Sequence, residues 1–150
     1  MTIAEALTNA ARTWQGTSGM RMMPTDEFVD DRSDLNVAVA AGGHLVTVAY
    51  SWLHEGEPQT GLLVLNDADD AGGVQAVWAD SFHQQPAWMT LHGTVTGSTV
   101  FVENQYAEDA KWGITVDATN PDELHLTMHH AYQSPDFYDC VRGIYTPAPA

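Results

Sequence analysis

Basic residues and cysteine are scarce in this sequence. Its 150 residues include 5 Lys and Arg against 20 Asp and Glu, which gives a formal net charge of −15. A field of that sign repels polyanions, so nucleic acid and anionic membrane surfaces are poor partners. The single cysteine, Cys140, excludes an internal disulfide and a cysteine-based zinc cluster within one chain.

Long apolar stretches are absent as well. No run approaches the roughly 18 apolar residues of a membrane-spanning helix. The opening residues, MTIAEALTNAARTW, lack the basic start and apolar stretch of a signal peptide. We therefore expect a cytoplasmic protein. With 44% hydrophobic residues, residues 1–150 have enough apolar content for the core of one domain.

Turn-forming segments divide most of the chain into short strands. One helix is predicted over Thr2–Arg12, because Thr2 and Glu5 have the spacing of a capping box and apolar residues recur at helical intervals. The later segments recur about every dozen residues, as in an antiparallel meander. They begin near Trp14, Leu35, His44, Gly61, Val74, Trp88, Thr99, Trp112, Leu124 and Phe137.

Alternation along these segments predicts which side chains point inward, because successive strand residues face opposite sides of a sheet. One such face carries Val74, Ala76, Trp78, Asp80 and Phe82. Many one-faced strands and a single short helix favour a sheet that closes on itself. We predict an all-β fold, an antiparallel up-and-down barrel of about ten strands, wide enough to enclose a ligand. A two-sheet sandwich with a filled core is the alternative.

Several short motifs carry a family resemblance. A helix leading into TWQG (13–16) resembles the calycin group, which includes lipocalins, fatty-acid-binding proteins and nitrobindins. Four further segments carry a second likeness, namely AGGHLVTVAYSW (41–52), EGEPQTGLLVLND (55–67), VWADSF (77–82) and YDCVRGIYTP (138–147). They resemble an uncharacterised bacterial domain-of-unknown-function family with a lipocalin-like barrel, over nearly the whole chain.

The resemblance implies a structural closure between the first and last strands. In calycins the first-strand tryptophan commonly packs against an arginine of the last strand, which implies a cation–π contact between Trp14 and Arg142. The first strand here lacks the denser glycine pattern of nitrobindins, which weakens an assignment of haem. The absence of a signal peptide and of a disulfide distinguishes the chain from secreted lipocalins.

The histidines do not form a recognisable metal motif. His125 and His129 lie on one face of a strand with Cα atoms about 13 Å apart, too far to share a zinc ion. We therefore expect no metal site. Haem stays open as an alternative cofactor, with His130 as its axial ligand, because His130 shares the inward phase of Met128.

The predicted inner faces are rich in aromatic residues. They indicate a cavity for a small hydrophobic or aromatic molecule, which the protein binds without catalysing a reaction. The candidate ligand-binding residues are Tyr50, Trp52, Trp78, Asp80, Phe82, Asn104, Tyr106, His130 and Tyr132. A carboxylate in apolar surroundings needs a partner, so we expect Asp80 to pair with Arg142, Asn104 or a histidine. Alternation does not decide which residues near Trp88 point into the barrel.

Two further features concern function. No nucleophile elbow, phosphate-binding loop or paired-acid signature is present, so an enzyme is disfavoured. A filled barrel that dimerises through its outer face is the third hypothesis, beside ligand binding and haem binding.

The acidic segment Pro24–Asp34 is predicted as a solvated loop, with a lid over the barrel mouth or an extension of the second strand as alternatives.

Overall fold

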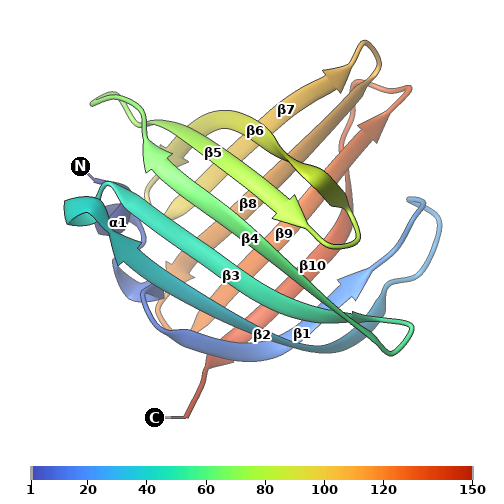
Figure 1. Ribbon diagram of the computed structural model, residues 1–150, viewed down its shortest axis with the longest axis horizontal. Helices are drawn as coiled ribbons and strands as arrows, with labels where there is room; N and C mark the ends of the chain where they lie inside the picture. Colours follow the sequence, from blue (N-terminus) through green and yellow to red (C-terminus); the bar gives the residue numbers. More distant parts are fainter. Residues whose placement is uncertain (1, 150) are drawn as a thin grey trace.

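The computed structural model describes residues 2–149 and confirms the predicted fold class. Ten antiparallel strands form a closed barrel in the order β1-β10-β9-β8-β7-β6-β5-β4-β3-β2, so each strand pairs with its sequence neighbour and β1 closes on β10 (Figure 1). The strands are β1 Thr13–Met20, β2 Val29–Ala40, β3 Leu45–His54, β4 Glu57–Asp67, β5 Gly73–Asp80, β6 Gln84–Thr96, β7 Thr99–Ala107, β8 Ala110–Asn120, β9 Glu123–Tyr132 and β10 Tyr138–Pro147.

The helix is shorter than predicted. The capping box between Thr2 and Glu5 is present, but α1 covers only Ile3–Ala6 and is followed by a 3-10 turn at Thr8–Ala10. The helix ends because the Thr8 hydroxyl donates a 2.6 Å hydrogen bond to the Glu5 carbonyl, a local competitor of the helical ladder. No helix of residues 2–149 is long and apolar enough to cross a membrane.

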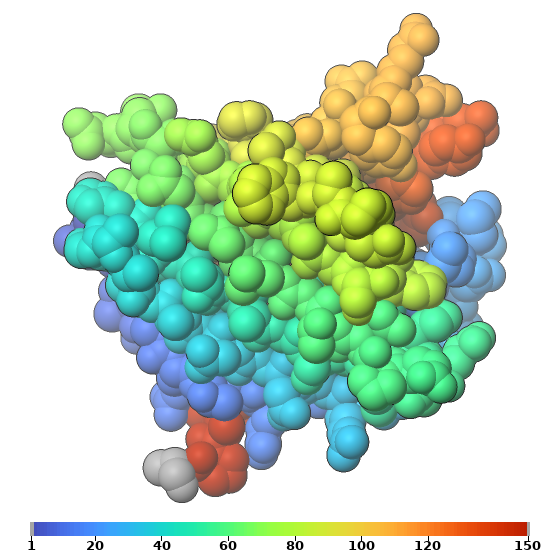
Figure 2. Space-filling model, viewed as in Figure 1, coloured from blue at the N-terminus to red at the C-terminus, as the bar shows by residue number. Residues whose placement is uncertain are grey.

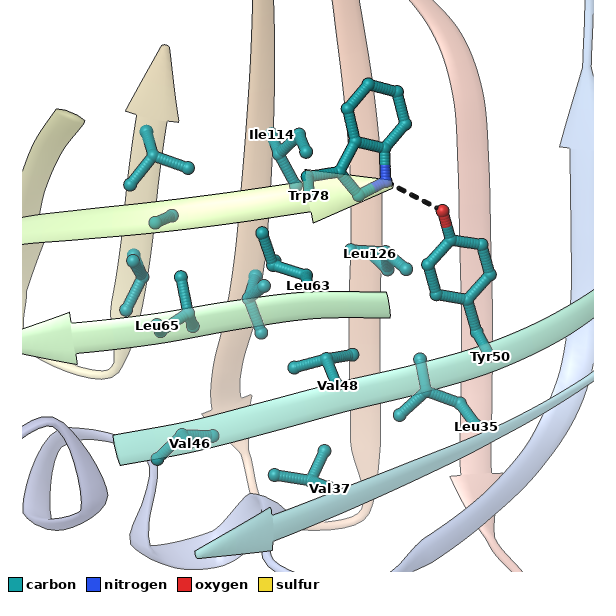
Figure 3. Close-up of a cluster of buried hydrophobic side chains, with 14 of the residues drawn as sticks. Leu35, Val37, Val46, Val48, Tyr50, Leu63, Leu65, Trp78, Ile114 and Leu126 are labelled. Atoms are coloured by element: carbon teal, nitrogen blue, oxygen red, sulfur yellow. Dashed lines mark hydrogen bonds between the residues drawn. The ribbon is translucent and has the colours of Figure 1, made fainter. Parts of the chain in front are cut away.

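Aliphatic side chains fill the half of the barrel next to α1. The alternation predicted for the strands is confirmed here, since every second residue is buried along most of their length. Figure 3 shows this cluster, which includes Leu35, Val37, Val46, Val48, Leu63, Leu65, Ile114 and Leu126. Each fully buried leucine contributes roughly 1.5–3 kcal/mol relative to an exposed one, so this half stabilises the barrel.

The outer wall is not uniform. Figure 2 shows an unbroken surface over β2 to β5, where the strands pair along most of their lengths. In contrast, β6 and β7 pair only from His92–Glu103 to Thr96–Thr99 and then diverge toward the end of the barrel opposite α1 (Figure 1). At the point of divergence the Asn104 amide donates a 2.6 Å hydrogen bond to the Thr90 carbonyl.

The expected contact between Trp14 and Arg142 is wrong. Trp14 is in register with Pro147, whereas Arg142 is in register with Gly19, further along β1. The guanidinium of Arg142 instead lies 4.2 Å from the centre of the Phe28 ring. Strand register therefore separates the two residues along the barrel axis, although both belong to the β1–β10 pair.

Trp14 has a different structural role. Its indole N–H donates a 2.9 Å hydrogen bond to the carbonyl of Ala10, and its side chain is buried. The guanidinium of Arg12 lies 5.7 Å from its ring centre. Trp14 thus joins the N-terminal turn to the first strand at the closed end of the barrel.

The acidic segment divides between two of its predicted forms. Its second part, from Val29 onward, is an extension of β2. Most side chains there are exposed, while Ser33 is buried and shares a 2.8 Å hydrogen bond with the Tyr145 hydroxyl. Only the residues before Val29 form a loop.

Candidate functional site

A cavity of about 610 Å³ occupies the end of the barrel opposite α1. Its volume lies within the roughly 300–1,000 Å³ of small-molecule sites in proteins. Aromatic and imidazole rings dominate its lining: Trp78, His83, Trp88, Tyr106, Trp112, His130 and Tyr138. The barrel is therefore filled at one end and hollow at the other, a distinction that a strand pattern does not contain.

A layer of hydrogen-bonded aromatic residues separates the core from this cavity. The Trp78 indole donates to the Tyr50 hydroxyl at 2.9 Å (Figure 3). That hydroxyl donates to Asp80 Oδ2 at 2.7 Å. The Trp52 indole donates to the same Oδ2 at 3.2 Å. Burial, assisted by the charge of Asp80, raises the pKa of Tyr50 well above its usual value. Tyr50 thus remains a protonated donor.

Asp80 has partners other than those expected. Neither Arg142, Asn104 nor a histidine side chain hydrogen-bonds to it within the described residues. Its second oxygen, Oδ1, accepts from the backbone N–H groups of Phe82 (2.8 Å) and His83 (2.9 Å). The carboxylate therefore fixes the turn between β5 and β6, and this turn places the His83 side chain at the base of the cavity.

His83 is the main site residue that sequence reasoning missed. Its ring stacks on Trp52, with centroids 5.4 Å apart and an interplanar angle of 15°. Burial lowers the pKa of His83, so the imidazole is neutral near pH 7. Its Nε2 atom is buried and has no hydrogen-bond partner in the described part of the chain. His83 lies in a turn, where strand alternation gives no phase.

Trp112 supplies a second unpartnered atom. Its indole stacks on Trp78 with centroids 5.2 Å apart, and its centroid lies 5.5 Å from that of His83. The Nε1 of Trp112 is buried without a partner among residues 2–149. The alternation through Ile114 and Val116 on β8 places Trp112 on the inner face, so a sequence signal for it existed.

Four of the predicted site residues line the cavity together, namely Trp78, Asn104, Tyr106 and His130. The hydroxyl of Tyr106 lies 2.6 Å from His130 Nε2, and burial lowers the pKa of His130. Tyr132 does not line this cavity, because it ends β9 at the barrel rim and is 58% exposed.

The remaining predicted residues lie in the layer below the cavity. Tyr50 and Trp52 are buried there around Asp80. Phe82 packs edge-on against Trp52 with centroids 5.6 Å apart. These side chains support the cavity base, and whether any of the predicted residues binds a ligand stays a prediction.

The loop between β1 and β2 is tied down beside the cavity. Arg21 donates through Nε to the Asp139 carbonyl at 2.7 Å and through Nη1 to the Pro24 carbonyl at 3.0 Å. The Tyr138 hydroxyl donates to the Met22 carbonyl at 2.6 Å. Arg21 is the one Lys or Arg in the cavity lining, so it brings positive charge to the mouth of an acidic protein.

The site offers binding groups rather than a metal cluster or a nucleophile. Within residues 2–149, no group of three or more His, Cys, Asp and Glu is placed to hold a metal ion. Burial raises the pKa of Cys140 to about 12, so its thiol is protonated at neutral pH. Both carboxylate oxygens of Asp80 already accept hydrogen bonds from the protein.

Fold and cavity together define a closed, ten-stranded antiparallel β-barrel with a ligand-sized cavity at one end. A crystal structure of Rv2717c from M. tuberculosis shares the fold with a TM-score of 0.66 and 17% identity over 99% of both chains. The S-type phycobiliprotein lyase CPES from Guillardia theta does so with a TM-score of 0.67 and 10% identity over 100% of this chain and 94% of that one. At these identities the likeness concerns the fold alone. No family model and no curated protein matches the sequence.

Proposed function

We propose that this protein binds a small, planar and partly apolar molecule in the cavity at the open end of the barrel. The observation that carries the proposal is a cavity of about 610 Å³ lined by His83 and Trp112, whose buried His83 Nε2 and Trp112 Nε1 atoms have no hydrogen-bond partner among residues 2–149. A buried polar group without a partner costs about 1–3 kcal/mol. A ligand that hydrogen-bonds to both atoms recovers this cost.

The lining defines the chemistry of the ligand. The indole of Trp112 is a donor only, so it requires an acceptor such as a carbonyl oxygen or a ring nitrogen. Stacked tryptophan rings favour a flat, conjugated ring system. Arg21 at the mouth favours a ligand without positive charge there.

Binding without catalysis agrees with the state of the reactive side chains. The thiol of Cys140 is protonated, and the oxygens of Asp80 are held in the supporting layer. The cavity of about 610 Å³ at one end of the barrel favours ligand binding over the hypothesis of a filled barrel that acts as an interaction module. Dimerisation and a cytoplasmic location stay predictions.

Titration with a planar aromatic probe tests the proposal. We expect 1-anilinonaphthalene-8-sulfonate to bind at one site, with a rise in its emission and quenching of tryptophan fluorescence. Trp112→Phe keeps the stacked ring but removes the donor, so affinity should fall about tenfold, the equivalent of one hydrogen bond. Leu62→Ala, at an exposed position outside the cavity, is the control. An unaltered affinity in Trp112→Phe would contradict the assigned site.

Haem is a second candidate ligand because His83, an imidazole of the cavity lining, has a buried ring nitrogen without a partner among the described residues. Haem iron takes an axial histidine in many haem proteins. The cavity volume and the aromatic walls fit a flat macrocycle. His130, the ligand expected from the sequence, has its Nε2 engaged by Tyr106 at 2.6 Å, whereas His83 Nε2 has no partner. If haem binds, His83 is therefore the favoured axial ligand.

A haemin titration distinguishes the two histidines. A Soret band that appears at equimolar haemin in the wild type, shifts in His83→Ala and persists in His130→Ala supports axial ligation by His83. The reverse pattern restores His130 as the ligand. The absence of a Soret shift at stoichiometric haemin removes the haem candidate and leaves the aromatic-ligand proposal to its own titration.

A further inference from the structure

The cavity is bordered by β6 and β7 where these two strands no longer pair with each other. The ladder between these strands stops at His92–Glu103, although β6 begins at Gln84 and β7 continues to Ala107. The unpaired parts of both strands contribute to the cavity lining. The lining residues on the two sides are Gln84, Trp88, Met89 and Thr90 of β6, and Asn104 and Tyr106 of β7.

Two exposed aromatic residues flank this lateral gap. Trp88 on β6 is 69% exposed and Tyr106 on β7 is 49% exposed, yet both line the cavity. The two exposed rings place apolar surface at the edge of the cavity, where a ligand can cover it. The gap thus continues the aromatic lining of the cavity out to the surface.

The free strand edges are poorly suited to adding another strand. Pro86 on β6 has no N–H to donate to a neighbouring strand. The carbonyl of Thr90 already accepts from the Asn104 side chain at 2.6 Å. Features of this kind protect sheet edges from pairing with other chains. An extended peptide is therefore a poor occupant, and a small molecule that crosses the wall is a better one.

The loop at the barrel end restricts the other way out of the cavity. Arg21 and Tyr138 hold residues 22–26 by hydrogen bonds to the carbonyls of Met22 and Pro24. Beside the gap, β6 and β7 are joined among the described residues by one side-chain hydrogen bond, from the Asn104 amide to the Thr90 carbonyl. The gap is thus the less constrained path between the cavity and solvent.

We propose that the ligand is an elongated molecule whose planar end occupies the cavity and whose other end leaves through the β6–β7 gap against Trp88. This inference rests on the proposed function, since it assigns the shape of the ligand for the same site. It explains why an exposed tryptophan and a buried pair of unpartnered nitrogens belong to one continuous cavity. The polar base orients the planar end, and the apolar gap accepts a tail.

Two probes that differ only in a tail test this inference. Dansylamide is compact, and N-decyl dansylamide adds an alkyl chain to the same fluorophore. In the wild type we expect the tailed probe to bind at least about tenfold more tightly, because its chain buries apolar surface in the gap. In Trp88→Ala the advantage of the tail, measured as the ratio of the two dissociation constants, should largely disappear, whatever the change in the affinity for dansylamide itself. The fold of Trp88→Ala is checked by circular dichroism.

Tyr132→Ala is the matched control, because Tyr132 is an exposed aromatic residue on the rim outside the gap. It should retain the full advantage of the tailed probe. The inference is overturned if the tail brings no gain in affinity, if the gain survives Trp88→Ala, or if Tyr132→Ala loses it as fully as Trp88→Ala does. Failure of both probes to bind the wild type would instead overturn the proposed function, and the inference with it.

Discussion

The Tyr50 hydroxyl donates a 2.7 Å hydrogen bond to Asp80 Oδ2 at the boundary between the filled and the hollow halves of the barrel. The same hydroxyl accepts a 2.9 Å hydrogen bond from the Trp78 indole, so one oxygen atom joins two strands on either side of β4. Asp80 then fixes the turn that carries His83. The layer that supports the cavity is therefore connected directly to the residues at its base.

Removal of the Tyr50 hydroxyl should destabilise the protein. In Tyr50→Phe, Asp80 no longer accepts a hydrogen bond from residue 50, and the buried Trp78 N–H has no acceptor. The free energy of unfolding should therefore fall by about 1–3 kcal/mol. Urea denaturation followed by tryptophan fluorescence measures this change. Tyr132→Phe, at an exposed position, should stay within about 0.5 kcal/mol of the wild type. Equal effects in the two variants would show that the hydrogen-bonded layer contributes no stability.

Gly61 makes room for this arrangement from the neighbouring strand. A Cβ atom at Gly61 would clash with the hydroxyl and the ring carbon Cζ of Tyr50, so a side chain there forces Tyr50 away from Asp80. Overpacking of this kind costs about 1–3 kcal/mol. We expect Gly61→Ala to lower the urea midpoint and to weaken binding of the aromatic probe. In the Tyr50→Phe background most of the steric loss should persist, because the added Cβ would clash with the ring carbon Cζ as well as with the hydroxyl.

The barrel itself was predictable from the sequence for a clear physical reason. Period-two alternation, as in Val46, Val48 and Tyr50, records which side chains are buried, and turn residues record where the chain reverses. Ten such segments with one short helix leave closure of the sheet as the way to bury every inner face. Fold class and strand positions depend on these local patterns, so the sequence contains them.

The site depends on information of another kind. His83 lies outside any alternating segment, and its place is set by two backbone hydrogen bonds to Asp80. The gap between β6 and β7 depends on where one ladder ends, which alternation does not encode. The same holds for Trp14 and Arg142, whose separation follows from the register of β1 with β10. Register, ladder length and cavity volume are properties of the folded chain.

The single cysteine should be unreactive in the folded protein. Burial raises the pKa of Cys140 to about 12, and its Sγ lies 3.5 Å from the Met128 carbonyl. At pH 8 we expect no measurable reaction with 5,5′-dithiobis(2-nitrobenzoate) in buffer and one thiol per chain in denaturing urea. Trp88→Cys, at an exposed position, should add one fast-reacting thiol to the folded protein. Rapid native labelling of Cys140 would mean that β10 opens readily beside the cavity.

His83 should make the stability of the protein depend on pH. Burial lowers the pKa of His83 below its ordinary value of 6.5, with a smaller lowering from His54 and His130 and an opposing effect of Asp80. As pH falls through 6.5, the unfolded chain binds a proton that the folded chain does not yet bind. The contribution of His83 to stability is therefore complete above the unfolded pKa and declines as pH falls toward the folded pKa.

Urea midpoints at pH 7.5, 6.5 and 5.5 test this expectation. The wild type should lose stability over this range, and His83→Phe, which keeps a ring against Trp52, should lose less. His92→Phe serves as the control, because His92 is exposed and lies outside the cavity lining. The carboxylates are common to all three proteins, so their effect cancels in the comparison of slopes. A slope in His83→Phe as steep as in the wild type would show that His83 titrates alike in the folded and unfolded states, and hence that its imidazole is solvated rather than held dry at the base of the cavity.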